Sequence, residues 1–268
     1  TGDSNVVIGE NALYASLLSD DTVAIGFDAL YSQTVDGTSF NTAIGTKSGR
    51  SLTTGTENTI VGYRAGYALD GGASSNTLIG TYAYYAGDGD DNVAIGLNAG
   101  QNAGDSNNCV FVGSKAGGVG VVVGDGNIAI GYLSGYNLTD GAANTLVGEE
   151  AGYAITTASD TVLVGYGAGK AITTEYGNTA IGHKTLFAST GNYNTSVGYT
   201  AGQAQTSAGD NTFIGSYAGQ ATTTGGENTA VGRNAMLYNV DGIRNTVLGA
   251  HAGYGASTKS FGDRTLIG

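Results

Sequence analysis

The 268-residue sequence contains no proline, no tryptophan and only one cysteine. Charged residues make up 12% of it, with 10 Lys and Arg against 22 Asp and Glu and a net charge of −12. A chain this poor in basic residues is not expected to bind nucleic acid or an anionic membrane. The lone Cys109 excludes an intrachain disulfide, and we expect a buried, inert thiol there. No run of about 20 apolar residues is present, so we expect no membrane insertion, and no signal peptide is recognisable at Thr1.

Glycine, in contrast, is abundant and regularly placed. Of the 48 glycines, sixteen end a five-residue phrase that varies on Asn-Thr-Ala-Ile-Gly, and these sixteen are 16 to 19 residues apart, most often 17. They are Gly9, Gly26, Gly45, Gly62, Gly80, Gly96, Gly113, Gly131, Gly148, Gly165, Gly182, Gly198, Gly215, Gly232, Gly249 and Gly268. A fixed period of this kind predicts an all-β parallel solenoid, or β-roll, of about 15–16 coils. The absence of proline agrees, because nearly every strand N–H would be donated to the next coil.

The phrase itself predicts a short β-strand. The residue before the glycine is always Ile, Val or Leu, and the residue two positions earlier is always Thr, Val or Ile, so these two columns share one face. The residue between them points the other way and is apolar in fifteen of sixteen copies, including Leu146, Leu163 and Phe213, with Ser196 as the exception. A strand that is apolar on both sides belongs to a parallel sheet covered on both faces. We assign the two-column face to the interior of the coil, and we expect the middle column to contact other copies in a parallel homotrimer.

Other columns predict the rest of each repeat. The strand-ending glycine suggests a corner with positive φ or a close backbone approach. Asn stands four residues before twelve of the sixteen glycines, which favours a stack of amide hydrogen bonds along the solenoid over the alternative of a surface row of ligands. The remainder is a polar turn rich in Gly, Thr, Asp and Glu.

These phrases resemble known repeats. The segments 127–131 and 92–96, each followed by a small residue three positions later, resemble the head repeats of trimeric autotransporter adhesins. The segment 178–182 with its Thr-Thr-Gly turn resembles repeats in tail-fibre-like proteins of phages and environmental bacteria. The resemblance covers essentially the whole chain and implies a trimer of left-handed parallel β-rolls. The adhesin repeat is shorter than 17 residues, and none of that family's receptor-binding residues can be placed on this sequence.

The sequence offers few candidates for chemistry. His183 and His251 occupy different repeat offsets, so we interpret them as surface residues and not as a ligand pair. The segment 165–170 resembles a phosphate-binding loop, but it lacks the four-residue gap before Gly-Lys and the hydroxyl after it. The acidic turn 87–92 lacks the bidentate Glu of a helix-loop-helix calcium site and does not recur. We therefore predict no catalytic, cofactor-binding or metal-binding residue, and no enzyme activity.

Taken together, these features predict one repeat domain, residues 1–268, that is a segment of a longer fibre. We expect a structural fibre or adhesin shaft that presents a binding end by geometry, located outside the cell, on its surface or on a virion. Its partners would be copies of itself, with loops available to a host-surface glycan or protein. An ice-binding solenoid is the first alternative, which would require the Thr column to lie on the surface. A glycan-active β-helix enzyme is the second.

Overall fold

The computed structural model describes residues 2–16, 18–118, 120–255 and 261–268. None of these residues is helical, and the chain is a parallel β-solenoid of about 15 turns with a repeat of about 17 residues. The contacts divide it into two compact units, Thr1–Leu133 with Leu138–Asp140, and Ser134–Asn137 with Gly141–Gly268. The predicted solenoid class is thereby confirmed.

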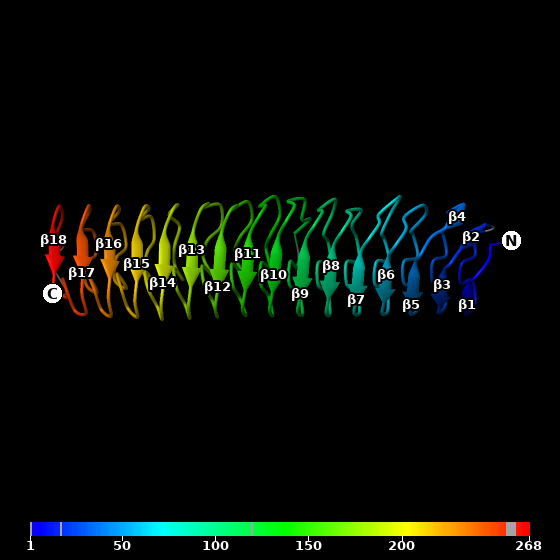
Figure 1. The fold of residues 1–268 in the computed structure, drawn as a ribbon, viewed down its shortest axis with the longest axis horizontal. Coiled ribbons are helices and arrows are strands. Elements are labelled where there is room, and N and C mark those ends of the chain that lie inside the picture. The colour runs from blue at the N-terminus through cyan, green and yellow to red at the C-terminus, as the bar shows by residue number, and fades with distance from the viewer. Residues whose placement is uncertain (1, 17, 119, 256–260) are drawn as a thin grey trace. The chain divides into compact units, whose positions relative to one another are not determined.

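In the first unit, parallel strands follow one another in the order β1-β3-β5-β6-β7-β8-β9-β10 (Figure 1). Their register places each phrase on the next, for example Thr42↔Thr59 and Ile44↔Val61. A small second sheet pairs β2 with β4 in parallel. The strands are β1 (Val6–Ile8), β2 (Ser19–Asp20), β3 (Val23–Ile25), β4 (Gly37–Thr38), β5 (Thr42–Ile44), β6 (Thr59–Val61), β7 (Thr77–Ile79), β8 (Val93–Ile95), β9 (Val110–Val112) and β10 (Ile128–Ile130).

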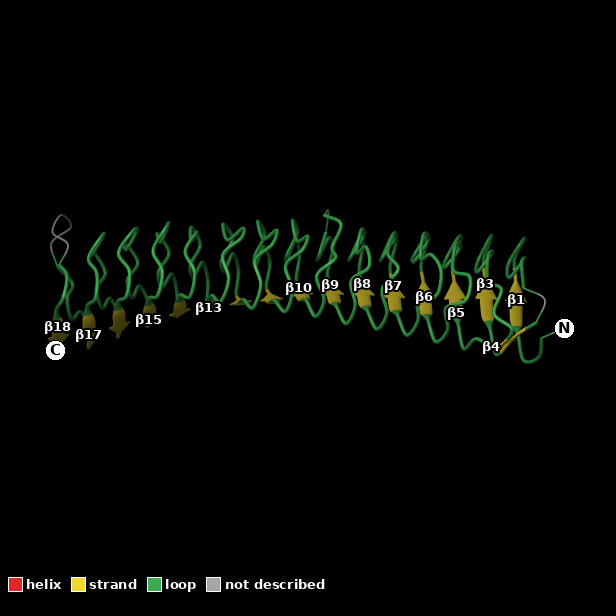
Figure 2. Ribbon diagram, turned by 90° about the horizontal axis from the view of Figure 1, so that it is seen from above, coloured by secondary structure: helices red, strands yellow, loops and turns green. Residues whose placement is uncertain are grey.

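The second unit repeats this arrangement with strands in the order β11 to β18. Register is again phrase on phrase, for example Thr212↔Thr229 and Ile214↔Val231. In each unit the strands lie along one side and the irregular turns form the opposite side (Figure 2). The strands are β11 (Thr145–Val147), β12 (Val162–Val164), β13 (Thr179–Ile181), β14 (Thr195–Val197), β15 (Thr212–Ile214), β16 (Thr229–Val231), β17 (Thr246–Leu248) and β18 (Thr265–Ile267).

A glycine follows each of the sixteen phrase strands because two backbones meet there. Gly62 adopts φ +137°, and a Cβ on it would lie 2.5 Å from the carbonyl oxygen of Gly80 on the next turn. Any side chain would therefore collide with backbone as well as adopt an unfavourable φ. The prediction of a glycine corner is confirmed.

Asparagine forms the predicted stack inside each unit. The side-chain oxygen of Asn41 accepts hydrogen bonds from the backbone N–H and the side-chain amide of Asn58, at 2.9 and 3.1 Å. Asn58 repeats both contacts with Asn76, and Asn211 repeats them with Asn228 in the second unit. Because these side chains are fully buried, each bond removes an otherwise costly unpaired group.

The interior is filled by the middle strand residue together with residues from the following turn. In two of the turns whose middle residue is small, those of Ala24 and Ala180, the residue four after the glycine is Leu30 or Leu186, and both leucines are fully buried. These leucines adopt φ of +48° and +47°, a conformation that costs about 1 kcal/mol or more. Burial of the leucine, about 1.5–3 kcal/mol, offsets that cost.

Candidate interaction face

The strands present two columns of side chains to the outside of each unit. The last residue of each strand is half-exposed, with Ile79, Ile130, Ile181 and Ile214 between 37% and 41% accessible. The prediction that this column is a buried stripe inside the coil was wrong. We call the surface formed by the first and last strand residues the strand face.

The middle column is the one that lies inside. Phe111, Leu146, Leu163 and Phe213 are all 0% exposed within a single chain. The expectation that this column contacts other copies was therefore also wrong, and so was the argument for a trimer that rested on it. Both sides of the strand are apolar, so the sequence pattern shows which residues share a side without showing which side is enclosed.

Threonine also faces outward, contrary to its predicted place inside. In the second unit seven of the eight first positions are Thr, including half-buried Thr212 and exposed Thr246. In the first unit three of eight are Thr, and the consecutive strands β8, β9 and β10 begin with Val93, Val110 and Ile128. The strand face of the first unit is thus more apolar than that of the second.

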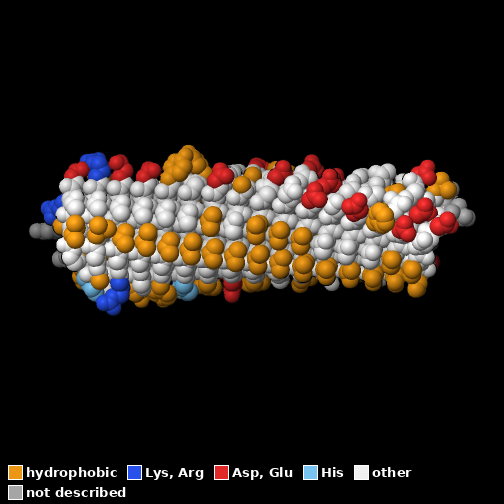
Figure 3. All heavy atoms as spheres, in the orientation of Figure 1, with side chains coloured by type: hydrophobic (Ala, Val, Ile, Leu, Met, Phe, Trp, Pro, Cys, Tyr) orange, Lys and Arg blue, Asp and Glu red, His pale blue; other side chains and the backbone are white. Residues whose placement is uncertain are grey.

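Two edges of different character border the strand face. The pre-strand edge consists of the two residues before each Asn position, and the post-strand edge consists of the two residues after each strand-ending glycine. In Figure 3 the acidic side chains of the first unit gather toward the pre-strand edge, and a band without charged side chains lies below them. In the second unit basic side chains show at both edges, and His side chains show at the post-strand edge.

The two edges differ most in their charged residues in the first unit. Its pre-strand edge holds seven acids and no Lys or Arg. Its post-strand edge holds three cations and two acids, together with four aromatic residues. The pre-strand acids are Asp3, Asp20, Asp21, Glu57, Asp90, Asp91 and Asp125, and the post-strand cations are Lys47, Arg64 and Lys115.

Aromatic rings lie beside two of the three post-strand cations, Lys47 and Arg64. The Arg64 guanidinium lies 5.2 Å from the ring centroid of Tyr63, 5.4 Å from Tyr67 and 5.9 Å from Tyr82. Such cation–π contacts stabilise a cation without neutralising it. Arg50, further along the turn, instead pairs with Asp28 at 3.2 Å.

Two buried polar atoms on the post-strand edge of the first unit have no hydrogen-bond partner. They are Nε of Arg64 and Oδ1 of Asn98, which occupy the same column two residues after the glycine. A buried donor or acceptor without a partner costs about 1–3 kcal/mol. The sequence analysis missed this edge. It could have been found from the repeat alignment, because acidic and basic residues occupy different positions of the repeat.

The predicted surface histidines are both exposed. His183 stacks between Tyr166 and Tyr199, with ring centroids 5.3 and 5.0 Å away. His251 Nε2 lies 3.0 Å from a guanidinium nitrogen of Arg233. The two histidines thus belong to separate clusters.

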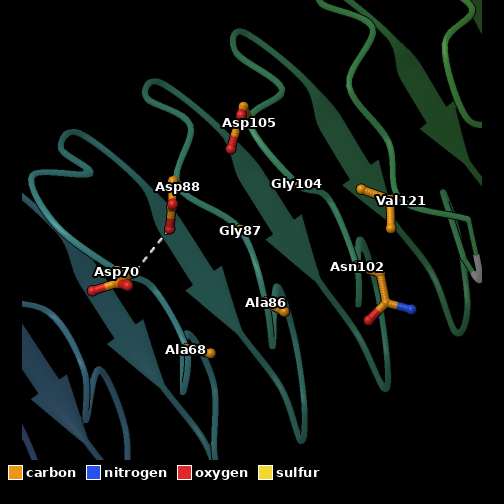
Figure 4. A pocket seen from close by; sticks show the side chains of 9 residues that line it. All are labelled: Ala68, Asp70, Ala86, Gly87, Asp88, Asn102, Gly104, Asp105 and Val121. Atoms are coloured by element: carbon orange, nitrogen blue, oxygen red, sulfur yellow. Dashed lines mark hydrogen bonds between the residues drawn. The ribbon is translucent and has the colours of Figure 1, made fainter.

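The segment 165–170 forms the regular corner of its repeat, and Lys170 Nζ is paired with Glu150 Oε2 at 2.7 Å. A depression of about 320 Å³ in the first unit is lined partly by Asp70, Asp88 and Asp105 on successive turns (Figure 4). Asp88 Oδ1 accepts the backbone N–H of Asp70 at 2.9 Å. Within the described ranges, no three His, Cys, Asp or Glu side chains are arranged to hold a metal ion.

Cys109 is buried as expected and replaces asparagine in the stack. Its sulfur accepts the backbone N–H of Asn127 at 3.4 Å. Burial raises the pKa of the thiol, and burial likewise raises the pKa of the nearby Tyr84 hydroxyl. Both groups therefore stay protonated and unreactive near neutral pH.

No protein-family model matches the sequence, and a search of curated proteins found no match. Among the described residues there is also no helix with the length and apolar character to cross a bilayer.

Proposed function

We propose that the chain is a structural fibre or adhesin shaft whose copies assemble as a parallel homotrimer with their strand faces turned toward a common axis. The observation that carries the proposal is a strand face without charged residues on the sixteen phrase strands, in which one Ile, Val or Leu per turn is left half-exposed by the chain's own coil. A contiguous exposed surface of this kind is typical of an interaction site. The three-chain arrangement follows the adhesin head repeats that the phrases resemble, with the packing face opposite to the one expected from sequence.

The free energy available from covering this face is large enough for stable assembly. Burying a whole aliphatic side chain gains about 1.5–3 kcal/mol, so covering the exposed 41% of Ile214 gains roughly 0.6–1.2 kcal/mol. Over the eight strands of one unit this column alone would contribute about 5–10 kcal/mol. Association costs about 4–15 kcal/mol in lost freedom and ordering, so the two units together match or exceed it.

Such an assembly would act by geometry. Each turn adds about 4.8 Å of length, and stacked turns bound by backbone hydrogen bonds resist bending. We place the protein outside the cell, on the cell surface or on a virion, where a shaft would hold a binding end away from the surface. The polar turns would be free to contact a host glycan or protein.

Sedimentation of the purified chain tests this proposal. The wild type should sediment as a trimer, and the Ile130→Asp, Ile181→Asp double variant as a folded monomer, because the charges are harmless in water and costly in an apolar interface. Thr157→Asp, on an exposed turn, is the matched control and should remain trimeric. A wild type that stays monomeric at all accessible concentrations would refute the proposal.

The outward Thr column supports ice binding as a second candidate. In the second unit, regularly spaced Thr side chains on a parallel sheet satisfy the condition that this function requires. The two functions compete, because a strand face covered by other copies cannot contact ice. Thermal hysteresis by a monomeric wild type, abolished by Thr212→Asp with Thr229→Asp, would favour the ice-binding function over the shaft.

A further inference from the structure

The two edges of the strand face carry different charges, and this constrains how copies can meet. The pre-strand edge of the first unit is purely acidic among its ionisable residues, whereas the post-strand edge carries cations held against aromatic rings. Among the described residues, the ion pairs involve none of Lys47, Arg64 or Lys115. These cations are therefore not neutralised by carboxylates of their own chain.

Symmetry decides which edges become neighbours. When parallel copies are related by rotation about a common axis parallel to their solenoids, the post-strand edge of one copy adjoins the pre-strand edge of the next. When two copies pack face to face in antiparallel fashion, pre-strand edge meets pre-strand edge and post-strand edge meets post-strand edge, which would place acids against acids. Opposite charges at an interface favour the first arrangement and disfavour the second.

The turns containing β6 and β16 carry both halves of such a contact. In the β6 turn, exposed Glu57 lies on the pre-strand edge and Arg64 on the post-strand edge. In the β16 turn, exposed Glu227 and Arg233 occupy the same two edges. Rotation without a shift along the axis keeps equivalent turns level, so each Arg would meet the Glu of the neighbouring copy.

The Arg64 guanidinium is held in a fixed position on this edge. Arg64 Nε is buried and lacks an acceptor in the single chain, although its cation–π contacts fix the guanidinium. Arg64 as a whole is half-buried, so a docking carboxylate cannot reach the enclosed Nε but can accept hydrogen bonds from the outer end of the guanidinium, and charge-assisted hydrogen bonds of this type are among the stronger ones.

We infer that the post-strand edge is a docking site for the acidic pre-strand edge of a second, parallel copy of this chain, with Arg64 contacting Glu57 and Arg233 contacting Glu227. The inference rests on the proposed shaft, and adds to it the direction of the chains and the residues that set it. The strand face supplies affinity, and the edges supply orientation and register.

Charge reversal tests the Arg64–Glu57 contact. Arg64→Glu and Glu57→Arg should each raise the midpoint concentration of dissociation about tenfold at low salt, because one contact repeats at every chain junction. The double variant that exchanges the two charges should return to within about threefold of the wild type, as expected for directly interacting residues. Asp105→Arg, an equal charge change on the polar turn, should leave the midpoint unchanged. Failure of the double variant to recover would overturn the inference.

Cross-linking tests the chain direction separately. Under oxidation the Glu57→Cys, Arg64→Cys double variant should form covalent trimers, whereas Glu57→Cys alone should not; Cys109 is buried and does not interfere. Dimers linked through Glu57→Cys alone would show that like edges meet, which overturns this inference and leaves the assembly through the strand face standing. A monomeric wild type would overturn the proposed function itself.

Discussion

Neighbouring residues on β15 provide the sharpest test of which side of the strand is enclosed. Phe213 is 0% exposed in the single chain and Ile214 is 41% exposed. Phe213 packs in a cluster made mostly of alanines, Ala201, Ala218 and Ala230 among them, and alanines cannot move in to fill a vacated ring. Phe213→Ala should therefore cost about 3–5 kcal/mol, toward the upper end of that range.

Ile214→Ala should behave differently. Full burial would make the substitution cost about 2–5 kcal/mol, and the remaining exposure lowers this to roughly 1–3 kcal/mol in a single chain. If copies cover the strand face, the cost rises as the protein assembles. Phe213→Ala should show no such dependence on concentration.

Hydrogen exchange is the suitable assay, because a solenoid opens turn by turn and one denaturation midpoint would average over many turns. The free energy of opening should be measured at the β15 and β16 amides, at concentrations below and above the assembly midpoint. If Ile214→Ala cost more than Phe213→Ala in the dilute monomer, the interior described here would be wrong and the face expected from sequence would be right.

Two further substitutions test the buried polar groups. Ser196 Oγ is buried without a hydrogen-bond partner, in a column where Ala180 and Ala230 also occur. Ser196→Ala should therefore stabilise the β14 turn by about 1 kcal/mol, measured by hydrogen exchange. Ala180→Ser is the control and should have the opposite effect. Cys109→Asn should restore the amide stack and strengthen the bond that the Asn127 N–H now makes to sulfur at 3.4 Å, raising the midpoint of thermal unfolding by an amount equivalent to about 0.5–1.5 kcal/mol; a lower midpoint would show that the site does not accept an amide.

Much of the fold could be predicted from the repeat, because backbone requirements recur in every turn. Gly62 is required by contact with the Gly80 carbonyl oxygen, and Asn58 by two hydrogen bonds to Asn41. These are local or next-turn interactions, so a column of identical residues identifies them directly. The period, the strand positions and the asparagine stack were all accessible for this reason.

The inside and outside of the strand could not be predicted in the same way. Assigning Ile and Thr to the interior required the rest of the coil to leave little apolar volume, yet Leu52, Leu138 and Ile155, seven residues after their glycines, are also fully buried there. With those side chains pointing inward, one strand residue per turn suffices to complete the core. The pattern of alternation is the same for both assignments, so only the path of the turn distinguishes them.

The uniformity of the outward column is the remaining argument for a partner. Inside the coil the middle residue ranges from Ala to Phe, and other buried side chains fill the remaining volume, as Leu186 does in the turn of Ala180. The outward column has no such partner in its own chain, yet it is Ile, Val or Leu in all sixteen copies. A position exposed to water tolerates almost any residue, whereas a position packed against a neighbour at constant spacing tolerates only uncharged side chains of similar size. Contact with further copies of the same solenoid would require such a column, in which the side chains vary little in size although the chain itself leaves them exposed.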